Sequence, residues 1–206
     1  PSYAQEETLC HNAVSGANLA DVEHGIFRQY IVDAEYSDAL NIADDASRAG
    51  RPGWELGRGV VTMHLGDLNT ALRFLQDASA RLDAAGNWEN LEIIQVIGAP
   101  AYLAMCHALR GETETARLYL DNALMLSERS NHPTGRAFAL STTARVTWLL
   151  GDVDRNRAIC DELATLCRKH SFRYWLANAE CYLGWHESRD GRGAEAAARV
   201  YSALEE

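Results

Sequence analysis

The sequence is poor in proline, in lysine and in long apolar runs. Its 206 residues include only 4 prolines, and Lys169 is the single lysine among 19 basic residues. Ala, Leu, Arg and Glu are abundant instead, and these side chains lose little rotamer freedom in a helix. An all-α fold is therefore expected. The sequence contains no apolar run of about eighteen residues, the length that could span a bilayer. It also does not begin with the basic and then apolar segment of a signal peptide, so a cytoplasmic location is expected.

Positive charge and cysteine pairs are also scarce. The formal net charge is -10 at pH 7, and such a surface repels phosphate groups on average, so neither nucleic acid nor an anionic membrane is expected as a direct partner. The 5 cysteines form no CxxC pair and are interpreted as buried thiols of a reducing compartment. They are Cys10, Cys106, Cys160, Cys167 and Cys181.

Motifs for catalysis and for metal or cofactor binding are missing from the sequence. It contains no GxxxxGK[ST] phosphate loop, no HExxH, no EF-hand loop and no GxSxG. The 7 histidines are scattered, and none pairs with another at a spacing that suits a metal ligand set. We expect no cofactor, no metal and no enzymatic activity in this chain.

A repeated helical hairpin is what the sequence does contain. Gly111, Gly151 and Gly191 are expected turn residues spaced by forty positions, and earlier turns are expected at Ala34 and Gly66. Two helices joined this way cannot bury their apolar faces alone, so the hairpins are expected to stack. Small residues recur at fixed offsets, as close helix approach requires. Five positions after the turns stand Ala39, Ala71, Ala116, Asn156 and Ala196, and twelve after stand Ala46, Ala78, Ala123, Leu163 and Ala203.

The fourth unit departs from this pattern at Asn156 and Leu163. We expect one domain over residues 1–206. It would comprise a partial unit at 1–20, units near 21–53, 54–83, 100–133, 135–170 and 172–206, and an inserted connection at 84–99, with Pro100 opening the third unit.

The small-residue and turn-glycine pattern resembles the tetratricopeptide repeat (TPR), which implies a right-handed α-solenoid of about five TPR-like units. The forty-residue spacing is more similar to the helical-repeat region of large bacterial signalling ATPases, which carry a class III cyclase or a LuxR-type DNA-binding domain. The residues that carry this second resemblance are Phe172, Trp175, Leu176, Ala177, Gly184, Trp185, Gly191 and Arg192. It implies a non-catalytic sensor or interaction module for signal transduction or transcription regulation, with any ATPase or cyclase chemistry in other domains. The missing initiator Met suggests a piece of such a protein.

In a solenoid of this kind the first helix of each unit lines the concave groove. Residues about ten, six and three positions before each turn are then candidates to contact a ligand. They are His24, Arg28 and Ile31; Leu56, Val60 and Met63; Ala101, Met105 and Ala108; Ser141, Arg145 and Trp148; and Cys181, Trp185 and Ser188. Apolar area beside isolated arginines suits an amphipathic peptide, a partner helix, or a small ligand whose anionic end meets Arg28 or Arg145.

Other interpretations stay open at this stage. Trp148 and Trp185 could instead pack between adjacent units, because aromatic residues at helical spacing usually pack. The two arginines could pair with surface carboxylates. The whole chain could serve as a scaffold for self-association or protein docking, and an enzyme with an unrecognised site is the third alternative.

Overall fold

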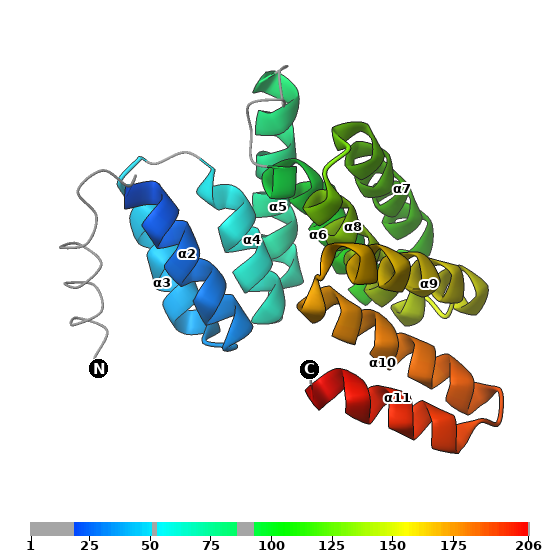
Figure 1. Cartoon of the computed structure of the whole chain (residues 1–206). Coiled ribbons are helices and arrows are strands. Elements are labelled where there is room, and N and C mark those ends of the chain that lie inside the picture. Colours follow the sequence, from blue (N-terminus) through cyan, green and yellow to red (C-terminus); the bar gives the residue numbers. More distant parts are fainter. Residues whose placement is uncertain (1–18, 51–52, 86–92, 206) are drawn as a thin grey trace. The chain divides into compact units, whose positions relative to one another are not determined.

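The computed structural model describes residues 19–50, 53–85 and 93–205, and every regular element in these ranges is an α-helix (Figure 1). The expectation of an all-α fold is confirmed. The helices are α2 (Leu19–Val32), α3 (Tyr36–Arg48), α4 (Trp54–His64), α5 (Leu68–Ala85), α6 (Ile93–Leu109), α7 (Thr113–Ser130), α8 (Pro133–Leu149), α9 (Val153–His170), α10 (Arg173–Arg189) and α11 (Gly193–Glu205). The partial unit expected at 1–20 lies almost wholly outside the described ranges.

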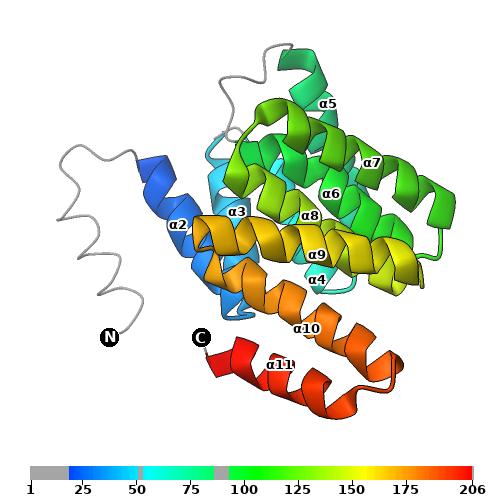
Figure 2. The same cartoon turned by 45° about the vertical axis from the view of Figure 1, so that its right-hand side comes forward.

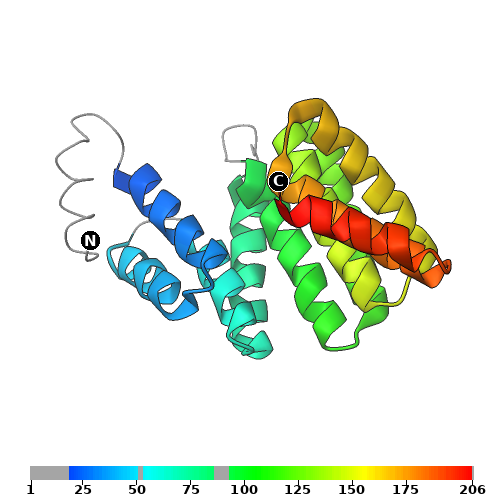
Figure 3. The ribbon, with the colours of Figure 1, turned by 60° about the horizontal axis from the view of Figure 1, so that its bottom comes forward.

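The chain divides into two compact units, Pro1–Ala71 and Leu72–Glu206, and each is described by itself. A single domain over 1–206 stays a prediction. In the first unit α2 and α3 form a hairpin, seen in blue in Figure 3, and α4 packs against α3. Its core contains Phe27, Ala39, Ala43, Ala46, Trp54 and Val61. The alanines that the repeat pattern placed after the first turn are thus buried, and they let α3 lie close to its neighbours.

In the second unit the hairpins α6–α7, α8–α9 and α10–α11 stack in chain order (Figure 2). α8 packs against both helices of the preceding hairpin, and α10 packs against α9 and α8. The interface of α8 and α9 with α10 has an apolar core of Ala137, Leu140, Leu163, Ala164, Cys167 and Ala179. Each hairpin therefore buries its apolar face against the next one.

Turns with a left-handed residue join the helices of these hairpins. Gly151 and Gly191 have φ values of 70° and 81°, a region that glycine enters without the strain a Cβ would add. The backbone N–H of Asp152 donates to the carbonyl of Thr147, and Arg192 donates to Glu187, both at 2.9 Å. The same helix-ending bond recurs at both turns, as the forty-residue spacing predicts.

α6 begins earlier than the sequence suggested. It starts at Ile93, so Gly98, which was expected to precede the helix, and Pro100, which was expected to open it, both lie inside it. Pro100 has no N–H to donate to a preceding turn, which disfavours an interior position. The residues around it, including Val96, Ile97, Ala99 and Ala101, are all buried, so apolar burial outweighs the local preference.

No helix within the described ranges combines the length and apolar character needed to cross a membrane.

Candidate functional site

Aromatic side chains link α6, α8 and α10 across the second unit. The rings of Tyr102 and Phe138 join α6 to α8, with centroids 5.9 Å apart. Trp148 joins α8 to α10, with its ring centroid 6.2 Å from that of Tyr182 and 6.5 Å from that of Trp185. Trp148 is 44% exposed despite these contacts. The first helices of three successive hairpins therefore carry an aromatic row that solvent reaches.

Arg145 brings positive charge to this row. It stands three residues before Trp148 on α8, a spacing that puts both side chains on one side of the helix. Burial raises the pKa of the Tyr102 and Tyr182 phenols, and the nearby Arg145 guanidinium opposes that rise in both. Arg145 is half-buried, and no carboxylate among residues 19–50, 53–85 and 93–205 forms an ion pair with it. A guanidinium that is partly removed from water, with donors still available, is suited to bind an anion.

A second arginine lies at the end of the row. The guanidinium carbon of Arg189 is 4.9 Å from the centroid of the Trp185 ring, in a cation–π arrangement. Trp185 is half-buried and Arg189 is exposed. We use the name aromatic–arginine face for Tyr102, Arg145, Trp148, Tyr182, Trp185 and Arg189.

Buried hydrogen bonds connect α8, α9 and α10 next to this face. We call this network the polar joint, and its residues are Ala144, Thr147, Asn156 and His186. The Nε2–H of His186 donates to the side-chain oxygen of Asn156 at 2.7 Å, and the Asn156 amide donates to the Ala144 carbonyl at 2.6 Å and to Thr147 Oγ1 at 3.1 Å. One Asn side chain thereby ties α9 to both α8 and α10. The His186 ring also lies edge-on to Trp185, with centroids 4.8 Å apart. The joint thus fixes how α10 presents Trp185.

The sequence-predicted residues of the second unit divide into two groups. Trp148 and Trp185 come together, Arg145 lies on the same helix face as Trp148, and Cys181 is half-buried on α10. Met105 and Ser141 are only 3% and 5% exposed, so their side chains fill the stack and present little surface to a ligand. Met105 stands six positions before its turn, as Arg145 does, and Ser141 stands ten before, as Cys181 does, so the offset alone does not determine which side chains are buried.

Three residues of the face were not predicted from the sequence. Tyr102 and Tyr182 stand nine positions before their turns, where ten was expected, and Arg189 stands two before, where three was expected. A helix turns by about 100° per residue, so an error of one position moves a side chain to a neighbouring face. Examining adjacent offsets for aromatic and arginine side chains would have found all three.

The candidates in the first unit are placed as follows. His24 stacks on Trp54 with ring centroids 4.3 Å apart, and Arg28 is exposed and donates through Nε to the His24 carbonyl at 3.3 Å. Leu56 is half-buried, whereas Val60 and Met63 are buried at 5% and 6% exposure. A groove that includes these residues stays a prediction.

Within the part of the chain that the structure describes, no three His, Cys, Asp or Glu side chains converge as metal ligands would.

Comparison with known proteins places the fold. No protein-family model matches the chain, and no curated protein matches it either. Among solved structures, it is similar to BtubC (BKLC) from P. vanneervenii, with 17% identity, a TM-score of 0.67, and coverage of 91% of this chain and 79% of that one. It is also similar to a Podosopora anserina putative kinesin light chain with nearly identical TPR-like repeats, with 14% identity, a TM-score of 0.59, and coverage of 90% and 93%.

These neighbours identify the class of fold. The chain is an α-solenoid of TPR-like helical hairpins, as the sequence predicted. At such low identity the likeness concerns the fold alone, and it does not extend to the signalling ATPases that residues 172–192 resemble.

Proposed function

We propose that this chain is a non-catalytic protein-binding module whose aromatic–arginine face binds an acidic segment of a partner protein. The observation that carries the proposal is Arg145, a half-buried guanidinium beside the exposed ring of Trp148 and without a carboxylate partner in the described ranges. Arg pairs with carboxylates through two parallel hydrogen bonds, and Trp and Arg are the side chains that most often dominate binding energy at interfaces.

The size of the face suits a peptide. Packed helices lie about 8–10 Å apart, so a ligand that crosses from α6 over α8 to α10 spans roughly 20 Å. An extended chain covers that distance in about six residues at 3.3 Å each. The overall net charge of -10 opposes a long polyanion, but it permits a short acidic segment that meets the local positive charge of Arg145 and Arg189.

A pair of matched hexapeptides tests the proposal. Acetyl-LELELE-amide and its neutral counterpart acetyl-LQLQLQ-amide differ only in charge, and isothermal titration measures both. We expect the acidic peptide to bind at least about tenfold more tightly, because only its carboxylates can form charge-assisted bonds to arginine. Arg145→Gln and Trp148→Ala should each weaken binding by about tenfold or more.

Arg155→Gln is the control variant, because Arg155 is an arginine of the same unit that already pairs with Asp121 at 2.5 Å. It should bind the acidic peptide like the parent chain. Equal affinity for the two peptides, or indifference to Arg145→Gln, would contradict the proposal.

The wider role follows from the resemblance of residues 172–192. We propose that the module is the sensor part of a bacterial signalling or transcription-regulating protein in the cytoplasm, where a bound partner alters the stack and thereby a linked domain. In the full-length gene product, a phosphate-binding loop, a cyclase domain or a helix-turn-helix would support this role. Their absence from that product would contradict it.

Self-association is the second candidate, and a separate observation favours it. Leu118 and Met125 are 71% and 47% exposed and stand seven residues apart on α7, so they share one side of that helix. A second copy of the chain covering this pair would give a mass that rises with concentration in light scattering. Leu118→Glu should abolish that rise while leaving peptide binding intact.

A further inference from the structure

Two grooves of the second unit occupy equivalent positions in successive hairpins. One lies between α7 and α9 over α8, and the other between α9 and α11 over α10, forty residues later in the repeat. In the first groove Arg136 bridges the walls: it contacts Glu162 of α9 at 2.6 Å and Glu128 of α7 at 3.1 Å. Leu140 and Leu163 fill the space beneath and are fully buried. The first groove is therefore closed by its own side chains.

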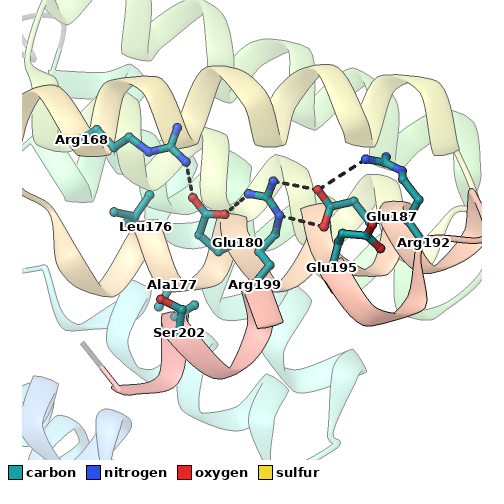
Figure 4. Close-up of a pocket in the computed structure, with 10 residues that line it drawn as sticks. Arg168, Leu176, Ala177, Glu180, Glu187, Arg192, Glu195, Arg199 and Ser202 are labelled. Atoms are coloured by element: carbon teal, nitrogen blue, oxygen red, sulfur yellow. Dashed lines mark hydrogen bonds and ion pairs between the residues drawn. The ribbon is translucent and has the colours of Figure 1, made fainter. Parts of the chain in front are cut away.

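The same five positions are occupied differently in the second groove. Arg168 stands where Glu128 would be, and Leu176 stands where Arg136 would be. The positions of Glu162, Leu140 and Leu163 are taken by Ser202, Glu180 and Ala203. Leu176 cannot bridge the walls as Arg136 does, and the bridge lies instead at Glu180, which pairs with Arg168 of α9 and Arg199 of α11. Ala203 is also much smaller than leucine. The result is an open hollow of about 500 Å³ between α9 and α11 (Figure 4).

The charged part of this hollow is a series of ion pairs among three arginines and the carboxylates beside them. Glu180 pairs with both Arg168 and Arg199, and Glu187 pairs with Arg199 at 2.7 Å and lies 3.9 Å from Arg192. Arg192 also pairs with Asp190 at 3.2 Å, so three guanidinium groups meet three carboxylates. Arg199 is fully engaged, since its Nε and both terminal nitrogens bond to these carboxylates. Arg168 uses a single terminal nitrogen, so it retains donors for a further anion.

The two ends of the hollow differ in chemistry. Arg168, Leu176, Ala177 and Ser202 lie at one end, whereas Glu195 lies at the other (Figure 4). Ser202 and Glu195 are seven residues apart on α11, which is about 10 Å along a helix. The Arg168 end therefore combines a cation that is paired with Glu180 through one nitrogen, a hydroxyl donor and apolar side chains, with the Glu195 carboxylate well removed.

We propose that the hollow between α9 and α11 is a second binding site, for a small carboxylate with an aliphatic body. The carboxylate takes the bridging position that Arg136 occupies in the preceding hairpin, and it accepts hydrogen bonds from Arg168 and Ser202. The aliphatic body lies on Leu176, Ala177 and Ala203. A volume of a few hundred Å³ is typical of small-molecule sites, and the apolar side chains of this hollow lie with Arg168 and Ser202 in its lining.

Octanoate and its neutral counterpart octanamide test this site by isothermal titration on the 206-residue chain. We expect saturable binding of octanoate, and binding of octanamide at least about tenfold weaker because it cannot form the charge-assisted bond. Arg168→Gln should reduce octanoate affinity by about the same factor. Ala203→Leu places a leucine at the position equivalent to Leu163 of the preceding hairpin. This larger side chain should fill the hollow and prevent octanoate from binding.

Thermal unfolding of each variant shows whether it is folded, and Arg168→Gln, an exposed substitution, tests the site even if Ala203→Leu does not fold. Arg155→Gln is the matched control and should leave octanoate binding unchanged. Arg145→Gln should also leave it unchanged, which separates this site from the aromatic–arginine face. Failure of octanoate to saturate below about 10 mM, equal affinity for octanamide, or full binding by folded Ala203→Leu would each overturn the proposal.

Discussion

His186 on α10 donates a buried hydrogen bond of 2.7 Å to Asn156 on α9, thirty residues earlier in the chain. The same Asn amide reaches the Ala144 carbonyl of α8, so a single side chain connects three successive helices. His186 is 1% exposed, and its Nδ1 has no hydrogen-bond partner among residues 19–50, 53–85 and 93–205. The bond to Asn156 therefore requires a proton on Nε2, and burial of the ring favours its neutral form, in which Nδ1 carries no proton.

Acid should loosen this joint. Burial lowers the pKa of His186, and the positive charges of Arg157 and Arg189 act in the same direction, against Asp190 and Asp161. A histidine whose pKa falls on folding stabilises the folded chain fully above its unfolded pKa of about 6.5, and that stability is lost as the pH decreases towards the folded pKa. Urea unfolding at pH values from about 7.5 to 5 should show the parent chain losing free energy of unfolding relative to His186→Gln, which cannot titrate. A constant difference between the two would contradict the prediction.

Asn156→Ala should lower the free energy of unfolding by about 2–3 kcal/mol, because it leaves the buried His186 Nε2–H and the Ala144 carbonyl without their partner. Urea denaturation measures the change. The double variant Asn156→Ala/His186→Leu removes both polar partners, so it should lose less than the sum of the two single variants. Strict additivity would show that the hydrogen bond contributes nothing specific.

Gly184→Ala should destabilise the α10–α11 hairpin by about 1–3 kcal/mol. A Cβ at Gly184 would lie 2.7 Å from a methyl group of Val200 and 3.2 Å from the Ala196 carbonyl oxygen. Adding Val200→Ala should recover part of the loss, since it removes the nearer atom. Gly193 has nothing within 4 Å of an added Cβ, so Gly193→Ala is the control and should be neutral or slightly stabilising.

Cysteine alkylation should be strongly selective in the folded chain. Burial raises the pKa of Cys160 to about 12 and the pKa values of Cys106 and Cys167 to about 11, so very little thiolate exists near pH 8. Cys181 is half-buried and should react with iodoacetamide first, in a Cys10→Ser background that removes the remaining thiol. Peptide mass mapping after partial labelling measures the order. Labelling of Cys160 before Cys181 would contradict it.

The hairpin architecture could be predicted because it depends on local signals. Gly151 and Gly191 mark turns whose left-handed φ values follow from the residue type, and the helical preference of the intervening residues needs no tertiary information. The start of α6 could not be predicted in this way. Local rules place Pro100 at a helix start, and only the burial of its neighbours Ile97 and Ala101 shows that the helix continues through it.

The candidate site was predictable in part. Offsets from the turn found Arg145, Trp148 and Trp185, but they missed Tyr182 by one residue because the rotation of each helix is set by packing. The two departures in the repeat pattern were more informative than the matches. Asn156 is the buried joint, and the pair Leu163 and Ala203 distinguishes the filled groove from the open one. Their roles depend on side chains of neighbouring hairpins, which a single position does not specify.

The joint at Asn156 also bears on cooperativity. Stability of a repeat array is approximately a sum of unit terms and nearest-neighbour interface terms, and Asn156 belongs to the interface term that couples the α10–α11 hairpin to the preceding one. Weakening that coupling allows the α10–α11 hairpin to open separately as its own cooperative unit. In Asn156→Ala, amide hydrogen exchange in α10 and α11 should therefore proceed faster than in α6 and α7, whereas the parent chain should open these segments together.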